Sequence, residues 1–372
     1  MHRLARAGLV LEHPATSLHA RKLVSRKLVW FTREFHFTQV DYSVVSVDEH
    51  VYLHTLCRPP RKGEEIWYNP RMGKEGYRAA ATESAGNLIE VRNLRIAFRM
   101  GAKTSVPVRG VSFDVPAGGH VALVGESGCG KSLTALAIGG LVDRADISGE
   151  VRGSPRIAYV FQNPMQSLNP TMKILNQIAE AVPGGPRGRR ARPAVAELLA
   201  AVGLPASAAD GYPCGLSGGQ QQRAMIAMAL AQKPDLLIAD EPTTALDVTT
   251  QREVLDLIAK VAGERGTAVL LITHNLGLVA RYAQYVNVMY AGQIVESGKT
   301  TSLLAAPRHP YTQGLVSAVP RLDAPKDAPL ADIPGTVPPP WDWPSGCAFH
   351  PRCPFAEPEC SSNSFNGLCP RL

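Results

Sequence analysis

Long hydrophobic runs are missing from this sequence. Nowhere in its 372 residues do about 18 apolar residues follow one another, whereas a helix that spans a bilayer needs about 20. We therefore expect that the chain does not cross a membrane by itself. The first residues, Met1-His-Arg-Leu-Ala-Arg6, also lack the apolar segment and cleavage site of a secretory signal.

A strong charge of one sign is missing as well. The net charge is +7, and 19% of the residues are charged, which describes an ordinary globular protein with room for roughly two or three domains. Such an excess could favour an anionic membrane surface or nucleic acid, but a solvated surface is the simpler interpretation. Six of the ten histidines lie within residues 1–86 without a compact H-E-x-x-H ligand spacing, so we interpret these six as incidental and not as a metal site.

Closely paired cysteines are absent too. The seven cysteines contain no C-x-x-C pair. The odd count, with one thiol inside a glycine-rich loop (Cys129), favours a reducing compartment over a disulfide framework. Four cysteines crowd the C-terminal end: Cys347, Cys353, Cys360 and Cys369. Four thiolates suit an iron–sulfur cluster or Zn²⁺, and thiols without a metal are the alternative.

What the sequence does contain is a glycine-rich loop, Gly125-Glu-Ser-Gly-Cys-Gly-Lys-Ser132, between a short apolar run and an apolar helical pattern. This is the phosphate-binding pattern G-x-x-x-x-G-K-[ST]. The glycines let successive N–H groups turn toward phosphate oxygens, and the positive end of the following helix faces the same anion. Lys131 is placed to reach the β- and γ-phosphates, and the Ser132 hydroxyl to bind Mg²⁺. An unliganded turn is the weaker alternative, so we predict a nucleoside triphosphate site.

Strand and helix patterns alternate around this loop. Residues 88–98 and 108–115 alternate apolar and polar side chains, as half-buried antiparallel strands do, and Pro107 fits the start of the second strand. Residues 236–239 and 268–272 are continuously apolar, as in parallel strands covered on both faces. Helical patterns lie at 220–232 and 251–265. The sequence predicts an α/β core with the phosphate loop at the strand ends of a parallel sheet.

Two carboxylates end the apolar run at 236–239. In a phosphate-loop protein, a carboxylate at that strand end holds Mg²⁺, which suits Asp240. Glu241 then lies beside the γ-phosphate, where it can polarise the attacking water. Turn-capping acids are the alternative. His274 closes the next apolar run, and by itself such a histidine is more often a structural residue.

A second anion-binding pattern follows at Leu216-Ser-Gly-Gly-Gln220, which opens a predicted helix. A serine and two glycines at a helix start leave N–H groups for an anion. Two phosphate sites in one chain suggest that two chains share two nucleotides head to tail.

In this order the motifs resemble those of the ATP-binding cassette (ABC) ATPases over about residues 88–320. The matching segments are Walker A at 125–132, the Q-loop at Gln162, the signature at 216–220, Walker B ending at Asp240 with the catalytic Glu241, the D-loop Ala245-Leu-Asp247 and the switch residue His274. The resemblance implies that ATP binds between the Walker motifs of one subunit and the signature of another. Closure then aligns water with Glu241 and His274, while Gln162 senses the γ-phosphate and the helical region after it touches a transmembrane partner.

The resemblance also implies a set of site residues. The expected catalytic residues are Glu241, His274, Gln162 and Lys131. Those expected at ATP are Phe98, Gly125, Glu126, Ser127, Gly128, Cys129, Gly130, Lys131, Ser132, Leu133 and Gln162. Those expected at Mg²⁺ are Ser132, Gln162 and Asp240. The signature residues, expected to face ATP bound to the partner subunit, are Ser217, Gly218, Gly219 and Gln220. The D-loop residue is Asp247. For Phe98, an aromatic core residue is nearly as good an interpretation as one that stacks on adenine.

Finer similarities point to the oligopeptide/dipeptide importer ATPases. They lie at 161–170, 291–298, 309–315 and 334–354. They imply a peripheral ATPase on the cytoplasmic face of the membrane, driving di- or oligopeptide import. The implied partners are two transmembrane permeases, a second ABC ATPase in a homo- or heterodimer and an extracytoplasmic solute-binding protein, with no nucleic acid. The alternatives are an importer of nickel or another small solute, and a soluble ABC ATPase acting on nucleic acid or ribosomes, which only the basic loop at 187–192 and the unassigned N-terminus favour.

The expected organisation has three parts. Residues 1–86 form an N-terminal extension without an assigned role, for which disorder is one interpretation. Residues 87–305 form the nucleotide-binding domain, which comprises a parallel sheet, an antiparallel sheet and a helical subdomain at about 163–233. Residues 306–372 form a small Cys/Pro-rich C-terminal extension, where the family tail favours [4Fe–4S] over zinc. One departure from the family is a short stretch between Gly149 and Ile157, which puts part of the antiparallel sheet in question.

Overall fold

The computed structural model describes residues 40–47, 50–57, 86–101, 103–185, 187–244, 246–319, 331–362 and 369. Within the predicted N-terminal extension it describes, besides Gly86, two strands, β1 (Val40–Val47) and β2 (His50–Cys57), which form a two-stranded sheet. The other expectations for that extension lie outside the described residues. The elements from β3 onward belong to one compact unit.

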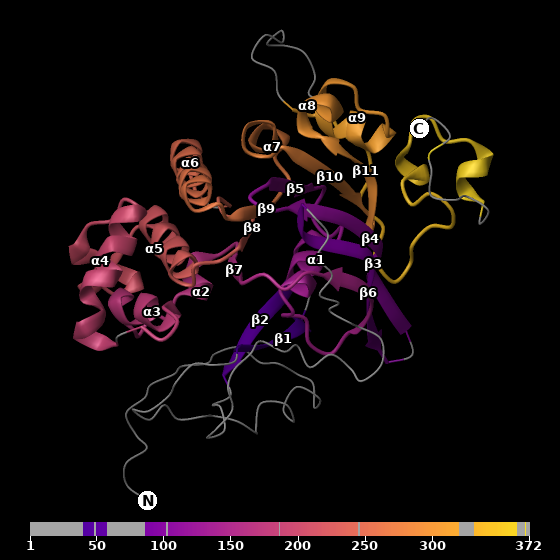
Figure 1. Ribbon diagram of the computed structural model, residues 1–372. Helices are drawn as coiled ribbons and strands as arrows, with labels where there is room; N and C mark the ends of the chain where they lie inside the picture. The colour runs from indigo at the N-terminus through magenta and orange to yellow at the C-terminus, as the bar shows by residue number, and fades with distance from the viewer. Residues whose placement is uncertain are drawn as a thin grey trace, which may run out of the picture. The chain divides into compact units, whose positions relative to one another are not determined.

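A six-stranded sheet in the order β11-β10-β5-β9-β8-β7 forms the centre of this unit (Figure 1). Its strands are β5 (His120–Val124), β7 (Ile157–Val160), β8 (Leu236–Asp240), β9 (Ala268–Thr273), β10 (Tyr285–Tyr290) and β11 (Gln293–Lys299). All neighbours pair in parallel except β11, which pairs antiparallel with β10. Every residue of β8 and β9 is buried, as their continuous apolar runs require. The predicted α/β fold is confirmed.

A second sheet is antiparallel, in the order β4-β3-β6. It contains β3 (Asn87–Met100), β4 (Lys103–Pro116) and β6 (Asp146–Arg152), so the short stretch before Ile157 still leaves room for a third strand. Our placement of Pro107 at a strand start was wrong, because β4 begins at Lys103. The register shifts between Ile96 and Phe98, and this bulge tolerates a proline that cannot donate to the ladder.

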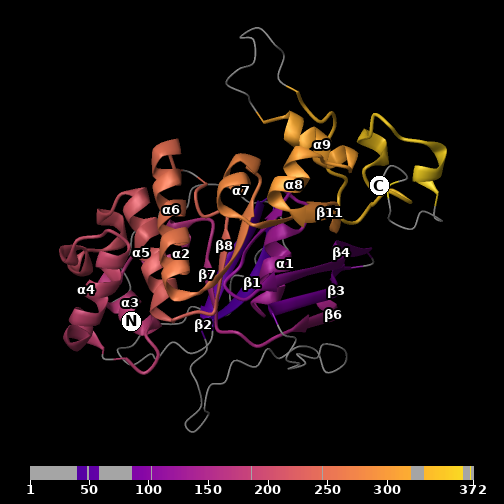
Figure 2. The same cartoon turned by 45° about the horizontal axis from the view of Figure 1, so that its top comes forward.

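In the described residues between β7 and β8, four α-helices gather on one side of the unit (Figure 2). They are α2 (Pro164–Ser167), α3 (Ile174–Ala181), α4 (Arg192–Ala201) and α5 (Gly218–Ala231). The basic stretch at 187–192, predicted as a loop, is not a loop throughout, because a short 3₁₀ helix (Gly188–Ala191) and the start of α4 fall in it. Arg189 and Arg190 remain exposed on that surface.

The remaining α-helices cover the sheets, and among them α6 has clear start and stop signals. They are α1 (Lys131–Ile138), α6 (Val248–Arg265), α7 (Leu276–Tyr282), α8 (Thr300–Ala305) and α9 (Pro310–Ser317). The α6 helix begins because Asp247 accepts N–H groups of the first turn, and it ends at Gly266 with a left-handed φ of 66°, the usual helix-stop residue. Over the described ranges, no helix combines the length and apolarity that a membrane span needs.

The C-terminal extension contains α9, and its described residues from 331 onward are irregular apart from two 3₁₀ turns, His350–Arg352 and Pro358–Ser361. It builds no large core of its own. Instead, Ile333, Ala348 and Phe349 join a buried cluster that contains residues of β10 and α9. The proline-rich tail is therefore held by packing against the nucleotide-binding core.

The antiparallel sheet yields a stability prediction with an internal control. Gly149 of β6 has φ 97°, and an added Cβ would clash with the carbonyl oxygen of Asn93 in the facing strand. We expect Gly149→Ala to lower the free energy of unfolding by about 2 kcal/mol or more, because both φ and space are unfavourable.

Gly263→Ala in α6 is the matched control. Nothing lies within 4 Å of an added Cβ there, so the same change should raise stability by about 0.4–1 kcal/mol through the entropy of the unfolded chain. Urea unfolding of both variants measures the difference. Equal effects of the two substitutions would contradict the left-handed backbone and the close contact at Gly149.

Candidate functional site

The phosphate loop joins β5 to α1. Gly125 follows the last residue of β5, and Gly130 caps α1 with φ 97°. An added Cβ on Gly125 would clash with the carbonyl oxygen of Met289, and one on Gly130 would lie 2.6 Å from that of Pro107. Both positions therefore require glycine. The loop wraps around the start of α1, whose N–H groups form a positively polarised end.

Lys131 points back into this loop. Its Nζ donates to the carbonyl oxygens of Gly125 and Glu126, each at 2.8 Å, and the residue is only 5% exposed. Ser127 and Gly128 are exposed within the loop. Cys129 is fully buried, and burial raises the pKa of its thiol. The loop therefore has an ammonium group ready for an anion, and its cysteine is a packing residue, not a reactive one.

Asp240 ends β8 next to this loop. Its Oδ1 accepts from the Ser132 hydroxyl at 3.0 Å, and its Oδ2 accepts from the Tyr159 hydroxyl at 3.1 Å. Burial raises the pKa of Asp240, while the two hydroxyl donors oppose that rise. A carboxylate and a hydroxyl side by side are hard oxygen ligands of the type that Mg²⁺ takes.

Glu241 follows with a left-handed φ of 43°, a backbone strain that tends to occur at functional sites. Its Oε2 accepts from Gln162 Nε2 at 3.2 Å and from the Thr244 hydroxyl at 2.9 Å. His274 Nδ1 lies 3.2 Å from Oε1 on the other side. Three predicted catalytic residues from three strand ends are thus in direct contact.

The signature residues lie elsewhere. Ser217 is the N-cap of α5 and forms a capping box: its hydroxyl accepts from Gln220 N at 3.3 Å, and Gln220 Oε1 accepts from Ser217 N at 3.0 Å. Ser217, Gly218 and Gln220 are exposed, and Gly219 is half-buried. In both views α5 lies apart from α1 (Figures 1 and 2). The chain does not bring its signature to its own phosphate loop.

Three more predicted residues occupy structural positions. Phe98 on β3 and Leu133 on α1 are half-buried against the core of the two sheets, which agrees with the core-aromatic alternative for Phe98. Asp247 caps α6 by accepting from Thr249 N and Thr250 N, and hydrogen bonds, chiefly that of the Thr250 hydroxyl, lower its pKa. Ala245 of the D-loop lies outside the described residues.

Four side chains that contact the site were not among the predicted ones. Tyr159 and Thr244 hold the carboxylates, as described above. Tyr311 and Arg352 both bond to Glu126 of the phosphate loop. Tyr159 and Thr244 carry no signal beyond closeness to a motif. Tyr311 and Arg352 lie in the segments 309–315 and 334–354 that resemble the importer ATPases, but nothing in those segments points to residue 126, because only the fold brings residues 311 and 352 there.

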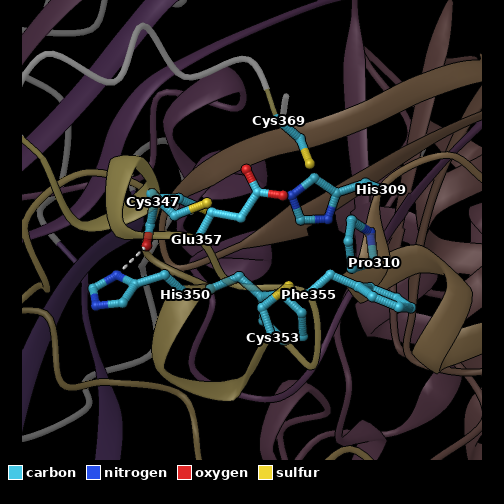
Figure 3. Close-up of a pocket in the computed structure, with 10 residues that line it drawn as sticks. His309, Pro310, Cys347, His350, Cys353, Phe355, Glu357 and Cys369 are labelled. Carbon is cyan, nitrogen blue, oxygen red and sulfur yellow. Dashed lines mark hydrogen bonds between the residues drawn. The ribbon is translucent and has the colours of Figure 1, made fainter. Parts of the chain in front are cut away.

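The four C-terminal cysteines line one pocket. Its wall comprises His309, Pro310, Cys347, Phe349, His350, Cys353, Phe355, Glu357, Cys360 and Cys369 (Figure 3). Burial raises the pKa of Cys347 and lowers that of His309 to about 4. Among the residues that the structure describes, no three His, Cys, Asp or Glu side chains are grouped closely enough to hold a metal ion as they stand. The pocket collects the thiols without arranging them around a metal.

Comparison with known proteins fits this geometry. The family profile for the ABC transporter matches residues 108–244, and that for the oligopeptide/dipeptide transporter C-terminal region matches residues 295–360. Among solved structures, the dimeric ATP-binding cassette MJ0796, in a post-hydrolysis state bound to ADP and Pi, has a TM-score of 0.52 and 28% identity. The match covers 57% of this chain and 98% of that one. The fold and site define an ABC transporter ATPase.

Full-length relatives narrow the class. A protein of Brucella ovis whose name describes it as a peptide import ATP-binding protein is 48% identical over 308 residues. The match covers 73% of this chain and 91% of the relative. The dipeptide transport ATP-binding protein DppD of Escherichia coli is 44% identical over 300 residues, 73% of this chain and 90% of DppD. The chain belongs to the ATP-binding proteins of the oligopeptide/dipeptide ABC import family, and as an ABC ATPase it uses ATP with Mg²⁺.

Proposed function

We propose that this protein is the ATP-hydrolysing subunit of an ABC importer for di- or oligopeptides. The observation that carries the proposal is the meeting of Lys131, Asp240 and Glu241 at one sheet edge. The extension profile and relatives named for peptide and dipeptide transport support the peptide solute.

We assign the site residues as follows. The phosphates of ATP lie along residues 125–132, with Lys131 neutralising the β- and γ-phosphates. Ser132 and Asp240, with Gln162, are the protein ligands that would hold Mg²⁺, which screens the phosphate charges. Glu241 takes the proton of the attacking water, and His274 donates toward the γ-phosphate side. The geometry that supports these roles is the shared contact of Gln162 and His274 with Glu241.

The same proposal gives the parts of the chain their tasks. Residues 87–305 act as the nucleotide-binding domain and 306–372 as the extension, while 1–86 have no assigned task. Exposed signature residues on α5 support an ATP site shared with a second ATPase subunit, as does the dimeric cassette of similar fold. We propose a peripheral position on the cytoplasmic membrane face, two permease partners contacted through the helices at 163–233, and a solute-binding protein outside.

Glu241→Gln should trap ATP. Replacing the carboxylate removes the base but keeps the size and the contacts of the side chain, so we expect kcat to fall on the order of a hundredfold or more while ATP affinity persists. Single-turnover hydrolysis and retained nucleotide measure the two effects. Glu264→Gln, at an exposed glutamate of α6, is the control and should hydrolyse ATP normally. Near-normal turnover of Glu241→Gln would reject Glu241 as the base.

The transport assignment is tested by what the chain binds in its host. Affinity-tagged protein, purified from gently solubilised membranes, should carry two multi-span permeases and a cassette partner. Peptide uptake should then depend on the chain, and nickel uptake should not. Co-purification with ribosomal or nucleic-acid-binding proteins, without a membrane protein, would overturn the transport claim and leave the ATPase chemistry standing.

We also propose that the cysteine pocket holds a metal centre, with [4Fe–4S] ahead of zinc. The supporting observation is the donor set: Cys347, Cys353, Cys360 and Cys369 line one pocket, and four thiolates are the ligands of such clusters. The grouping of the side chains is too loose for a metal as it stands, so binding would require the four thiols to move together and lose their protons.

Metal content decides this point. Protein prepared without oxygen should contain about four iron atoms and four acid-labile sulfides per chain if the cluster forms, or about one zinc ion if zinc binds. Cys353→Ser should lose that metal, whereas Cys214→Ser, at an exposed cysteine outside the pocket, should keep it. Anaerobic protein without stoichiometric iron or zinc would dispose of the metal centre.

A further inference from the structure

The C-terminal extension touches the phosphate loop directly. The contact is made at Glu126, the second residue of the loop, whose carboxylate is bonded by Arg352. The two guanidinium–carboxylate distances from Arg352 Nη1 are 3.0 Å to Oε2 and 3.2 Å to Oε1. Residues 226 positions apart in the chain therefore meet at the part of the site that receives phosphate.

Arg352 is held as firmly as a core residue. It is 8% exposed, and inside the extension its Nε donates to the carbonyl oxygen of Pro334 at 2.8 Å and its Nη2 to that of Ile333 at 3.0 Å. Burial disfavours its charge, but the hydrogen bonds to Tyr290 and Glu126 outweigh this and raise the pKa of Arg352. A buried arginine with these partners presents a fixed positive charge to Glu126.

Tyr311 of α9 makes a second contact with the same loop residue. Its hydroxyl accepts the backbone N–H of Glu126 at 2.8 Å, and its ring is fully buried against Tyr290 and Phe349. Glu126 is thus fixed at three groups: its N–H by Tyr311, its carbonyl oxygen by Lys131 and its carboxylate by Arg352.

We propose that Arg352 and Tyr311 are positioning residues for ATP binding, so that the extension forms part of the nucleotide site. Tyr311 fixes the backbone from which the loop turns toward the phosphates. Arg352 neutralises a carboxylate that would otherwise repel the phosphate chain in a partly buried setting. Neither residue needs to touch ATP.

Arg352→Met tests the charge. It leaves Glu126 uncompensated, so we expect the Kd of the full-length chain for Mg-ATP, measured by titration calorimetry, to rise about tenfold. Adding Glu126→Gln to Arg352→Met removes the repelling charge and should bring the Kd back to within about threefold of the unaltered chain. The Kd of Arg352→Lys, which keeps the charge, should lie between that of the unaltered chain and that of Arg352→Met.

The rescue by Glu126→Gln distinguishes a positioning role of Arg352 from a role in folding alone. A folding defect lowers the fraction of protein that can bind ATP but leaves the Kd of the remaining folded protein unchanged. Arg156→Met is the matched control, since it breaks an arginine–aspartate pair with Asp235 on the surface and should leave the Kd unchanged. If Arg352→Met does not fold, Tyr311→Phe, which loses only the hydroxyl, should still raise the Kd about threefold.

This inference rests on ATP binding at the phosphate loop. The same titration distinguishes a failure of ATP binding from a failure of the positioning role. Failure of the unaltered chain to bind ATP would overturn the site itself. The positioning role alone would be overturned if the unaltered chain binds ATP normally and Arg352→Met and Tyr311→Phe bind it with the same affinity as the unaltered chain. The absence of rescue by Glu126→Gln would overturn it as well.

Discussion

The arrangement of the candidate site depends on the parallel register of three central strands. Val124 of β5 pairs with Thr273 of β9, and Asp240 of β8 pairs with Ile272. Because the strands run the same way, their carboxyl ends lie at one edge, and the residue after each strand enters the same space. The ladder even extends one residue further, since Glu241 N donates to the Ile272 carbonyl oxygen at 2.9 Å. Without this register, the phosphate loop, the two carboxylates and His274 would not lie close together.

The charges at this edge are compensated by short contacts within the chain. Two carbonyl oxygens receive the Lys131 ammonium group, and two hydroxyls donate to Asp240. Glu241 is bonded by side chains from the Q-loop, its own turn and the residue after β9. Charged groups taken out of water need such partners. The site can therefore keep several charges close together in a rigid geometry, which catalysis by positioning and electrostatics requires.

The extension is joined to the nucleotide-binding core at more than one place. Besides the contacts at Glu126, Trp343 Nε1 donates to the carbonyl oxygen of Val106 at 2.9 Å, and Arg109 stacks over the Trp343 ring at 4.8 Å. Cys353 of the cysteine pocket directly follows Arg352, and Phe349 of the same pocket packs on Tyr311. The cysteine pocket and the phosphate loop are thus linked through Phe349, which packs on Tyr311, and through the bonds of Tyr311 and Arg352 to Glu126.

The sequence by itself determined the class of fold, the strands around residues 88–98, 108–115, 236–239 and 268–272, the helices around 220–232 and 251–265, and the motif residues that the structure brings into contact at Glu241. These follow from local signals: alternating or continuous apolar runs, apolar residues at helical spacing, and glycines that permit one loop. The bulge at Pro107 and the 3₁₀ turn inside the basic stretch escaped it, because facing strands and neighbouring helices decide such details. Only the tertiary structure could bring Tyr159, Tyr311 and Arg352 to the site. Their side chains act across long sequence separations, where no periodicity or spacing in the chain records which residues will meet.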